Sequence, residues 1–385
     1  MTIQVQVSQW TTFVPLTFER AVTGPPVLDA PDVDNRGFRD DEHGPVVGMT
    51  AGDTVRVALK KMTLDPAAPL FLTSTDTGVV ELFELPNGAL PAGERAEFRI
   101  HALPGTDEVR TARIEAHFGG TGGPVLGELT VRVFLLHNVS VTPHTIAILD
   151  STGGGVAVLP ELPRIMELVS AYWRPCGIGF TVEPTLDDSV TLTTAGVVKD
   201  RPWPGDDGSR SEIPTILNIR PAPNSINVYF VHRIGMANIL GYGFSPPNAR
   251  RFRMPHPGIL LAETDHQDLI FRDPEPVAND LAHEIGHFLT LEHYGNRQIP
   301  RELEDTWARR NLMHPYNLMY AHEDWPYNVD GHPAQNRPLV NNVGYGDYGR
   351  GGLVTLKDLP GIAQGDQTTI ARSVLPDPGT LYGTA

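Results

Sequence analysis

The sequence is poor in cysteine, with a single one, Cys176, in 385 residues. One cysteine cannot form a disulfide within the chain, and it excludes a zinc site built from four cysteines. Cys176 lies between an expected helix and an expected apolar strand, a position that predicts a buried, unreactive thiol.

Basic runs and long apolar runs are also missing. Lysine and arginine total 30 against 46 acidic residues, giving a formal charge of −16, and no basic cluster could follow a phosphate backbone. No stretch approaches the ~18 apolar residues that a membrane-spanning helix needs. The sequence therefore predicts no nucleic-acid partner and no membrane insertion, and it indicates no oligomeric state.

The first 21 residues lack the basic start and the apolar core of a secretory signal. They alternate polar and apolar residues instead. A leaderless export route and a mature chain whose leader has been removed would both give such a start, so the sequence predicts no localisation.

Glycine and proline are abundant, at 38 and 35, and are spread without a period, which is typical of a globular protein with many turns. Residues 3–20 and 52–135 contain short runs rich in Val, Ile, Thr and Phe between turn residues. This pattern predicts successive strands and a β-sandwich. Because the chain is longer than one core usually supports, we expect a β-rich accessory domain over 1–130 and a second domain over 131–385.

The second domain mixes strands with two substantial helices. Apolar spacing predicts a helix near 160–172 and another over 273–293, each with prolines at its start. Residues 224–234 and 256–265 read as strands, with GYGFSPPNARRFRMP as a loop between them. The predicted fold class is therefore α+β.

The segment LAHEIGHFLTLEH carries the residues that suggest chemistry. His283 and His287 are four positions apart, which on a helix places them ~40° apart in rotation and ~6 Å apart along the axis, suited to holding one metal ion. Glu284 is too far aside to bind the same ion comfortably but can reach a water bound to it. His293 would face away on a continuing helix, so the helix must end before it if it is a ligand.

This string resembles the HExxHxxGxxH motif of the metzincin family of zinc endopeptidases, with matches at His283, Glu284, His287 and His293. Thr290 stands where the family has glycine, and a β-branched residue resists a φ above zero. We estimate the strain at ~1 to 3 kcal/mol. Structural zinc binding is worth ~10 to 16 kcal/mol in small peptides, so we expect the site to survive with a different turn.

A second motif, NLMHP at 311–315, resembles the methionine turn that metzincins place beneath the metal. Met313 is the methionine of this turn, and Met319 in NLMYA is the rival candidate. The resemblance also implies that the strand before the zinc helix pairs with an extended substrate. The candidate substrate-binding residues are Gly258, Ile259 and Leu260, with Tyr316 as a candidate for the oxyanion.

The resemblance implies a fold with a twisted mixed sheet and two main helices, a Zn²⁺ cofactor and a protein or peptide substrate. Three neutral imidazoles would leave zinc an open position, where the pKa of a bound water falls towards ~7. Glu284 would then act as the catalytic base and as proton donor to the leaving amine.

Three alternatives remain open. The zinc could have a purely structural role, stabilising the second domain of a non-catalytic binding protein. In that case coordination by four protein ligands is expected. The amino half could be an inhibitory pro-segment, which predicts self-cleavage between about residues 125 and 140. Glu302 or Glu304 could replace His293 as the third ligand.

Overall fold

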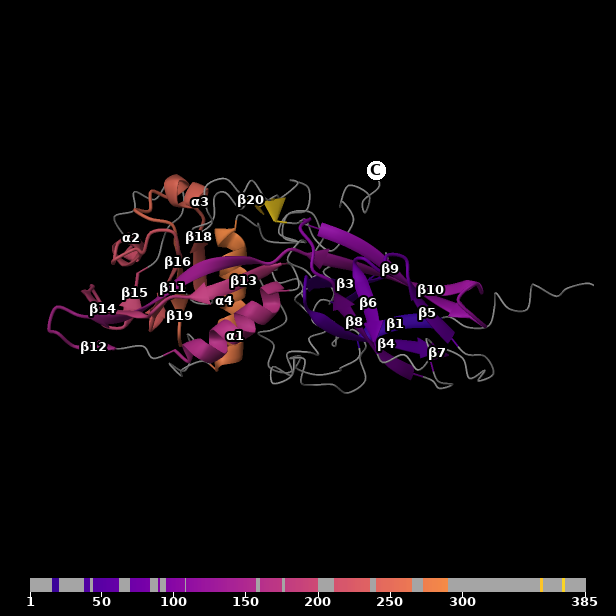
Figure 1. Cartoon of the computed structure of the whole chain (residues 1–385). Helices are drawn as coiled ribbons and strands as arrows, with labels where there is room; N and C mark the ends of the chain where they lie inside the picture. Colours follow the sequence, from indigo (N-terminus) through magenta and orange to yellow (C-terminus); the bar gives the residue numbers. More distant parts are fainter. Residues whose placement is uncertain are drawn as a thin grey trace, which may run out of the picture.

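The computed structural model describes part of the chain in detail (Figure 1), namely residues 16–20, 38–41, 44–61, 70–83, 89–90, 95–107, 109–156, 160–174, 177–199, 211–235, 240–264, 273–289, 354–355 and 369–370. These residues form a mixed α+β structure that is mostly sheet with few helices. The predicted α+β class is confirmed. Among the described helices, none combines the length and the apolar character needed to cross a membrane.

The amino-terminal half contains two sheets that share one core. The four-stranded sheet has the order β1 (Leu16–Arg20), β4 (Thr54–Lys61), β8 (Arg95–Ala102) and β6 (Val80–Phe83). The six-stranded sheet has the order β2 (Phe38–Asp41), β3 (Gly44–Thr50), β10 (Val125–Phe134), β9 (Val109–Phe118), β5 (Leu70–Ser74) and β7 (Ala89–Leu90). Val57 and Phe98 of the first sheet belong to the same buried cluster as Ile114 and Val131 of the second. Two sheets across one core are the layers of a sandwich, the architecture that the succession of short runs between turn residues predicted.

The second half is built on a seven-stranded sheet with the long strand β11 (His137–Leu149) inside it. One edge of β11 pairs in turn with β13 (Ile178–Val182) and β14 (Leu186–Thr191). The other edge pairs with β16 (Ile226–Val231) and β12 (Gly155–Val156). Next to β16 lies β19 (Gly258–Ala262), which is parallel to it, and then β18 (Gly241–Phe244), which is antiparallel to β19.

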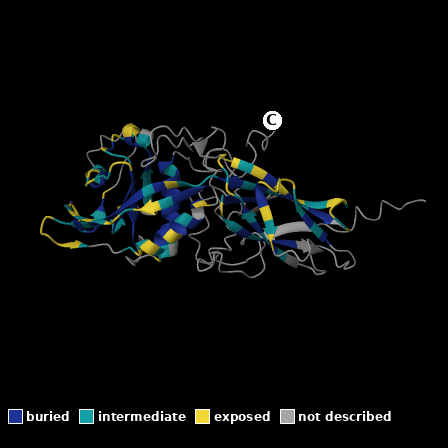
Figure 2. Ribbon diagram, viewed as in Figure 1, coloured by how far each residue is buried: buried dark blue, intermediate teal, exposed yellow. Residues whose placement is uncertain are grey.

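Helices and short strands cover this sheet. The helix α4 (Pro274–Phe288) contacts β18, β19 and the helix α1 (Leu162–Trp173). The other face contributes Tyr229 and Leu260 to a core with α2 (Ile213–Leu217) and α3 (Pro246–Arg251). The remaining described elements are β15 (Val197–Val198), β17 (Arg233–Ile234), β20 (Val354–Thr355) and β21 (Thr369–Ile370). Buried residues occupy the interior of both halves (Figure 2).

Two residues alone, Leu135 and Leu136, separate β10 from β11. The predicted domain boundary between residues 130 and 131 lies inside β10, and the division into two domains stays a prediction. Most of the range expected for self-cleavage, 125–140, is therefore paired strand. A protease needs an extended, accessible segment, and a sheet strand does not offer one.

A pair of opposite charges joins the two halves. The Nε of Arg174, just after α1, donates to Oδ2 of Asp53 at 2.8 Å, and its terminal nitrogen donates to Oδ1 at 2.6 Å. The hydroxyl of Thr50 donates to the carbonyl of Arg174. The last residue of β3 thus supplies a hydrogen bond to a carbonyl at the end of α1, where helical partners are missing.

Residues 241–255 differ from the sequence prediction. We expected a loop, whereas the structure has the edge strand β18 and the helix α3. Ser245 begins α3 because its side chain accepts a hydrogen bond from the backbone N–H of Asn248, and two prolines follow in the first turn.

Candidate metal centre

Helix α4 begins after Asp273, with proline in its first turn, and ends at Phe288. It is almost wholly buried, and the apolar side chains inside are Val277, Ala278, Leu281, Ala282, Ile285 and Phe288. The helix ends between His287 and His293, as a three-histidine site would require. A buried helix also forces the polar residues it carries into the interior, where each needs a partner or a function.

His283 and His287 lie side by side on α4, as their spacing predicted. Their ring centroids are 4.7 Å apart, with planes at 87° to each other. His283 is buried and His287 is half-buried. Two neighbouring imidazoles are suited to zinc, which prefers nitrogen and sulfur ligands.

The third predicted ligand, His293, lies outside the described residues, as do Met313, Tyr316 and Thr290. Among the described residues no group of three or more His, Cys, Asp or Glu side chains could hold a metal ion. The described part of the chain therefore provides two candidate ligands, and their roles stay predictions.

Glu284 lies between the two histidines in sequence and is buried. Its Oε2 has no hydrogen-bond partner among the described residues. Burial, followed by the nearby Asp280, raises the pKa of Glu284 to about 8, while a hydrogen bond from the backbone N–H of Gly243 acts in the opposite direction. A carboxyl group with a pKa near neutrality can both accept and donate a proton at physiological pH.

Asp280 precedes Glu284 by one helical turn and is 2% exposed. Asn279 beside it is fully buried. Two acidic groups one turn apart in a buried helix repel each other when both are charged. The polar cluster of α4 therefore extends one turn beyond the predicted motif, to Asp280, which was not among the residues predicted from the sequence.

Strand β18 lies directly against this cluster. A Cβ added at Gly241 would lie 2.7 Å from Cγ of Glu284. A Cβ added at Gly243 would lie 2.4 Å from the backbone oxygen of Glu284 and 2.8 Å from Cβ of His287. Neither glycine was among the residues predicted from the sequence, because both fall in a stretch that was expected to be a loop.

The predicted substrate-binding strand is wrong in one respect. Both edges of β19 are occupied, by β16 and by β18, and all five of its residues are buried. An extended peptide cannot pair with Gly258, Ile259 or Leu260, because their backbone groups already bond to neighbouring strands. No described strand pairs with the outer edge of β18.

A second buried histidine, His144, lies in the sheet away from this cluster. Its Nε2 is 2.9 Å from Oδ1 of Asn227, and its ring stacks on Tyr229 with centroids 4.3 Å apart. The Asn227 amide nitrogen donates to Ala222 and Ser225 carbonyls, so its oxygen accepts from His144. Burial is the main cause that lowers the pKa of His144. This histidine is neutral and structural.

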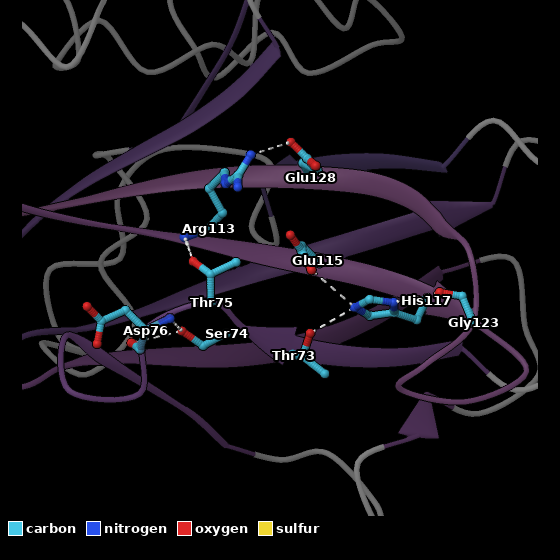
Figure 3. Close-up of polar contacts among 9 residues, drawn as sticks. All are labelled: Thr73, Ser74, Thr75, Asp76, Arg113, Glu115, His117, Gly123 and Glu128. Atoms are coloured by element: carbon cyan, nitrogen blue, oxygen red, sulfur yellow. Dashed lines mark hydrogen bonds and ion pairs between the residues drawn. The ribbon is translucent and has the colours of Figure 1, made fainter.

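A third polar cluster lies on the six-stranded sheet (Figure 3). The Nδ1 of His117 donates to the carbonyl of Gly123 at 3.0 Å, and its Nε2 lies 2.9 Å from the Thr73 hydroxyl and 3.3 Å from the Glu115 carboxylate. Both ring nitrogens therefore have partners that tie β5, β9 and the turn before β10 together. This arrangement supports a structural role rather than metal binding.

Comparisons with known proteins give weak likenesses. No protein-family model and no curated protein matches the chain. Mature mirolysin of Tannerella forsythia in complex with a cleaved peptide is 14% identical, with a TM-score of 0.30 and coverage of 42% of this chain and 66% of that one. Metalloproteinase-II from Bacteroides fragilis is 9% identical, with a TM-score of 0.24 and coverage of 79% and 84%. Likeness at this level supports no inference about fold or activity.

Proposed function

We propose that the protein is a zinc-dependent endopeptidase of the metzincin type. The observation that carries this proposal is the juxtaposition on α4 of two imidazoles, 4.7 Å apart, with the buried carboxyl group of Glu284. A helix that only filled a core would carry apolar residues at these positions, since burying polar groups costs free energy. Strongly perturbed carboxyl groups of this kind concentrate at functional sites.

His283, His287 and His293 would hold the Zn²⁺, with Met313 in the turn beneath it. Zinc bound there would supply a Lewis acid that polarises the scissile carbonyl and acidifies a water molecule. Glu284 would accept the proton of the attacking water and deliver it to the leaving amine. Its raised pKa suits the second step, and the approach of a cation would favour the charged form needed for the first.

An extended peptide would bind along the outer edge of β18 rather than along β19. The outer edge of β18 pairs with no described strand, and β18 contacts α4. Pairing by backbone hydrogen bonds would hold the peptide in an extended conformation beside Glu284. Tyr316 stays a candidate for the oxyanion.

The test is cleavage of a mixed peptide library by the zinc-loaded protein, with and without a chelator, with products identified by mass spectrometry. We expect cleavage that the chelator abolishes. Glu284→Gln should retain zinc and lose turnover. Glu167→Gln is the matched control, because it makes the same chemical change at an exposed position on α1.

Full activity in Glu284→Gln would refute the assignment of the base. Zinc bound at full stoichiometry with no cleavage by the unaltered protein would instead support a non-catalytic protein with a structural zinc site.

A further inference from the structure

Strand β18 has two chemically different faces. It reads Gly-Tyr-Gly-Phe from 241 to 244, and successive side chains point to opposite sides of a strand. Phe244 is buried, with its ring centroid 5.9 Å from that of Tyr242 and 6.1 Å from that of Phe252. The opposite face carries only the two glycines and lies against α4.

The strand cannot move away from α4 without breaking other contacts. Its backbone pairs with β19 over all four residues, from Gly241 opposite Leu261 to Phe244 opposite Gly258. Its aromatic face is packed into the core on the other side of the sheet. Since packed interiors have little spare volume, an atom added on the glycine face must be accommodated by α4.

The two glycines meet different parts of α4. The three atoms nearest to an added Cβ at Gly241 all belong to the Glu284 side chain, namely Cγ at 2.7 Å, Oε1 at 3.0 Å and Cδ at 3.1 Å. An added Cβ at Gly243 would lie closest to the helix backbone, at 2.4 Å from the carbonyl oxygen of Glu284, then 2.8 Å from the Cβ of His287 and 3.0 Å from Oε2 of Glu284. A side chain can rotate away, whereas a helix backbone cannot.

Backbone conformation does not explain either glycine. Neither has a φ in the left-handed region, where glycine is favoured over other residues. The absence of a side chain, rather than conformational freedom, is therefore what these positions provide.

We propose that Gly241 is a positioning residue, whose missing side chain lets β18 lie against the Glu284 carboxyl group and fix its orientation. Gly243 sets the distance between the strand and the helix that carries the histidines. The kinetic part of this inference rests on the proposed peptidase function, while the contact itself does not.

The kinetic test is Gly241→Ala in the zinc-loaded protein. Displacement of a catalytic group by about 1 Å costs on the order of 100-fold in rate, so we expect kcat to fall by about 10- to 100-fold. KM and zinc content should stay within about twofold, because the atoms nearest to the added Cβ belong to Glu284 and not to a histidine. Gly122→Ala is the control, since Gly122 is exposed and an added Cβ there meets nothing within 4 Å.

Gly243→Ala should behave differently. It presses on the helix backbone and on His287, so we expect a lower melting temperature and reduced zinc content as well as lost turnover. If Gly241→Ala and Gly243→Ala both lose zinc, or if neither does, the two glycines do not have the different roles proposed for them.

A thermal double-mutant cycle tests the contact without relying on activity. Gly241→Ala should lower the melting temperature by about 1 to 4 °C, which is the shift that a typical overpacking penalty gives in a chain of this length. In a Glu284→Ala background the same substitution should lower the melting temperature less or not at all, because the three atoms nearest to the added Cβ are absent. If Gly241→Ala alone does not fold, the proposal still requires that the double variant with Glu284→Ala folds.

The outcomes separate the two claims. An inactive natural protein with the expected thermal coupling would refute the proposed function and leave the contact established. If the natural protein is active, two results would overturn the positioning role. One is a kcat of Gly241→Ala within twofold of the natural value, and the other is an equal decrease in melting temperature in both backgrounds.

Discussion

Removal of the Glu284 charge should stabilise the metal-free protein at high pH. The perturbation is Glu284→Gln, which keeps the size of the side chain and removes its titration. The pKa of Glu284 is raised from 4.5 to about 8, with burial as the first cause and Asp280 as the second. The folded chain therefore keeps a proton between these two pH values that the unfolded chain releases.

The sign follows from proton linkage. Below pH 4.5 Glu284 is protonated in both the folded and the unfolded state, so its burial carries no charge penalty. As pH rises through this window the unfolded state is increasingly favoured, because it binds fewer protons than the folded state. Above about pH 8 the penalty is complete, and the distance between the two pKa values sets it at about 5 kcal/mol as an upper bound.

The assay is the urea midpoint of chelator-treated protein at pH 5, 7 and 9. The stability of Glu284→Gln relative to the natural protein should rise at each step. Glu167→Gln controls for the loss of one negative charge from a chain of formal charge −16. Added zinc should shrink the advantage of Glu284→Gln, because a nearby cation favours the carboxylate. A difference that is constant across pH, or that falls as pH rises, would refute the burial argument.

Three further predictions concern single contacts. His287→Ala should lose zinc, measured by mass spectrometry of the native protein, whereas retention of the metal would remove that histidine from the ligand set. Asp53→Asn and Arg174→Met should show a coupling of about 0.2 to 1 kcal/mol in a double-mutant cycle, since both groups are partly exposed. Strictly additive effects would mean that the ion pair contributes nothing. His144→Leu should reduce the loss of melting temperature between pH 7 and pH 5, because a buried neutral histidine with a lowered pKa destabilises the fold as pH falls below its unfolded value. An unchanged loss would show that other groups control acid unfolding.

The helix and the placement of its histidines were predictable because both depend on local geometry. Four residues make about one helical turn, so His283 and His287 had to be neighbours once the segment was helical. The apolar spacing over 277–288 then determined that this helix would be buried. Nothing beyond a dozen consecutive residues was needed for either step.

The edge of the sheet was not predictable in the same way. Glycine has low β propensity, so Gly-Tyr-Gly-Phe did not read as a strand, and β18 exists because it pairs with β19. Which strand lies outermost depends on the order of strands across the sheet, and here β18 precedes β19 in sequence but lies outside it. The substrate prediction came from the resemblance, which assigns substrate pairing to the strand before the zinc helix, and both edges of that strand are already paired here.

The choice between a catalytic and a purely structural zinc site depends on Glu284 more than on the histidines. A structural site needs ligands only, and its surroundings are most stable when they are apolar or fully hydrogen-bonded. Here a carboxyl group with one unpartnered oxygen is buried beside the two imidazoles, one turn from the second acid, Asp280. That arrangement lowers the stability of the metal-free fold. A purely structural zinc site would not benefit from it. A base that must take up and release a proton next to a cation requires such surroundings, because a well-solvated carboxyl group would keep a pKa too low to protonate a leaving amine.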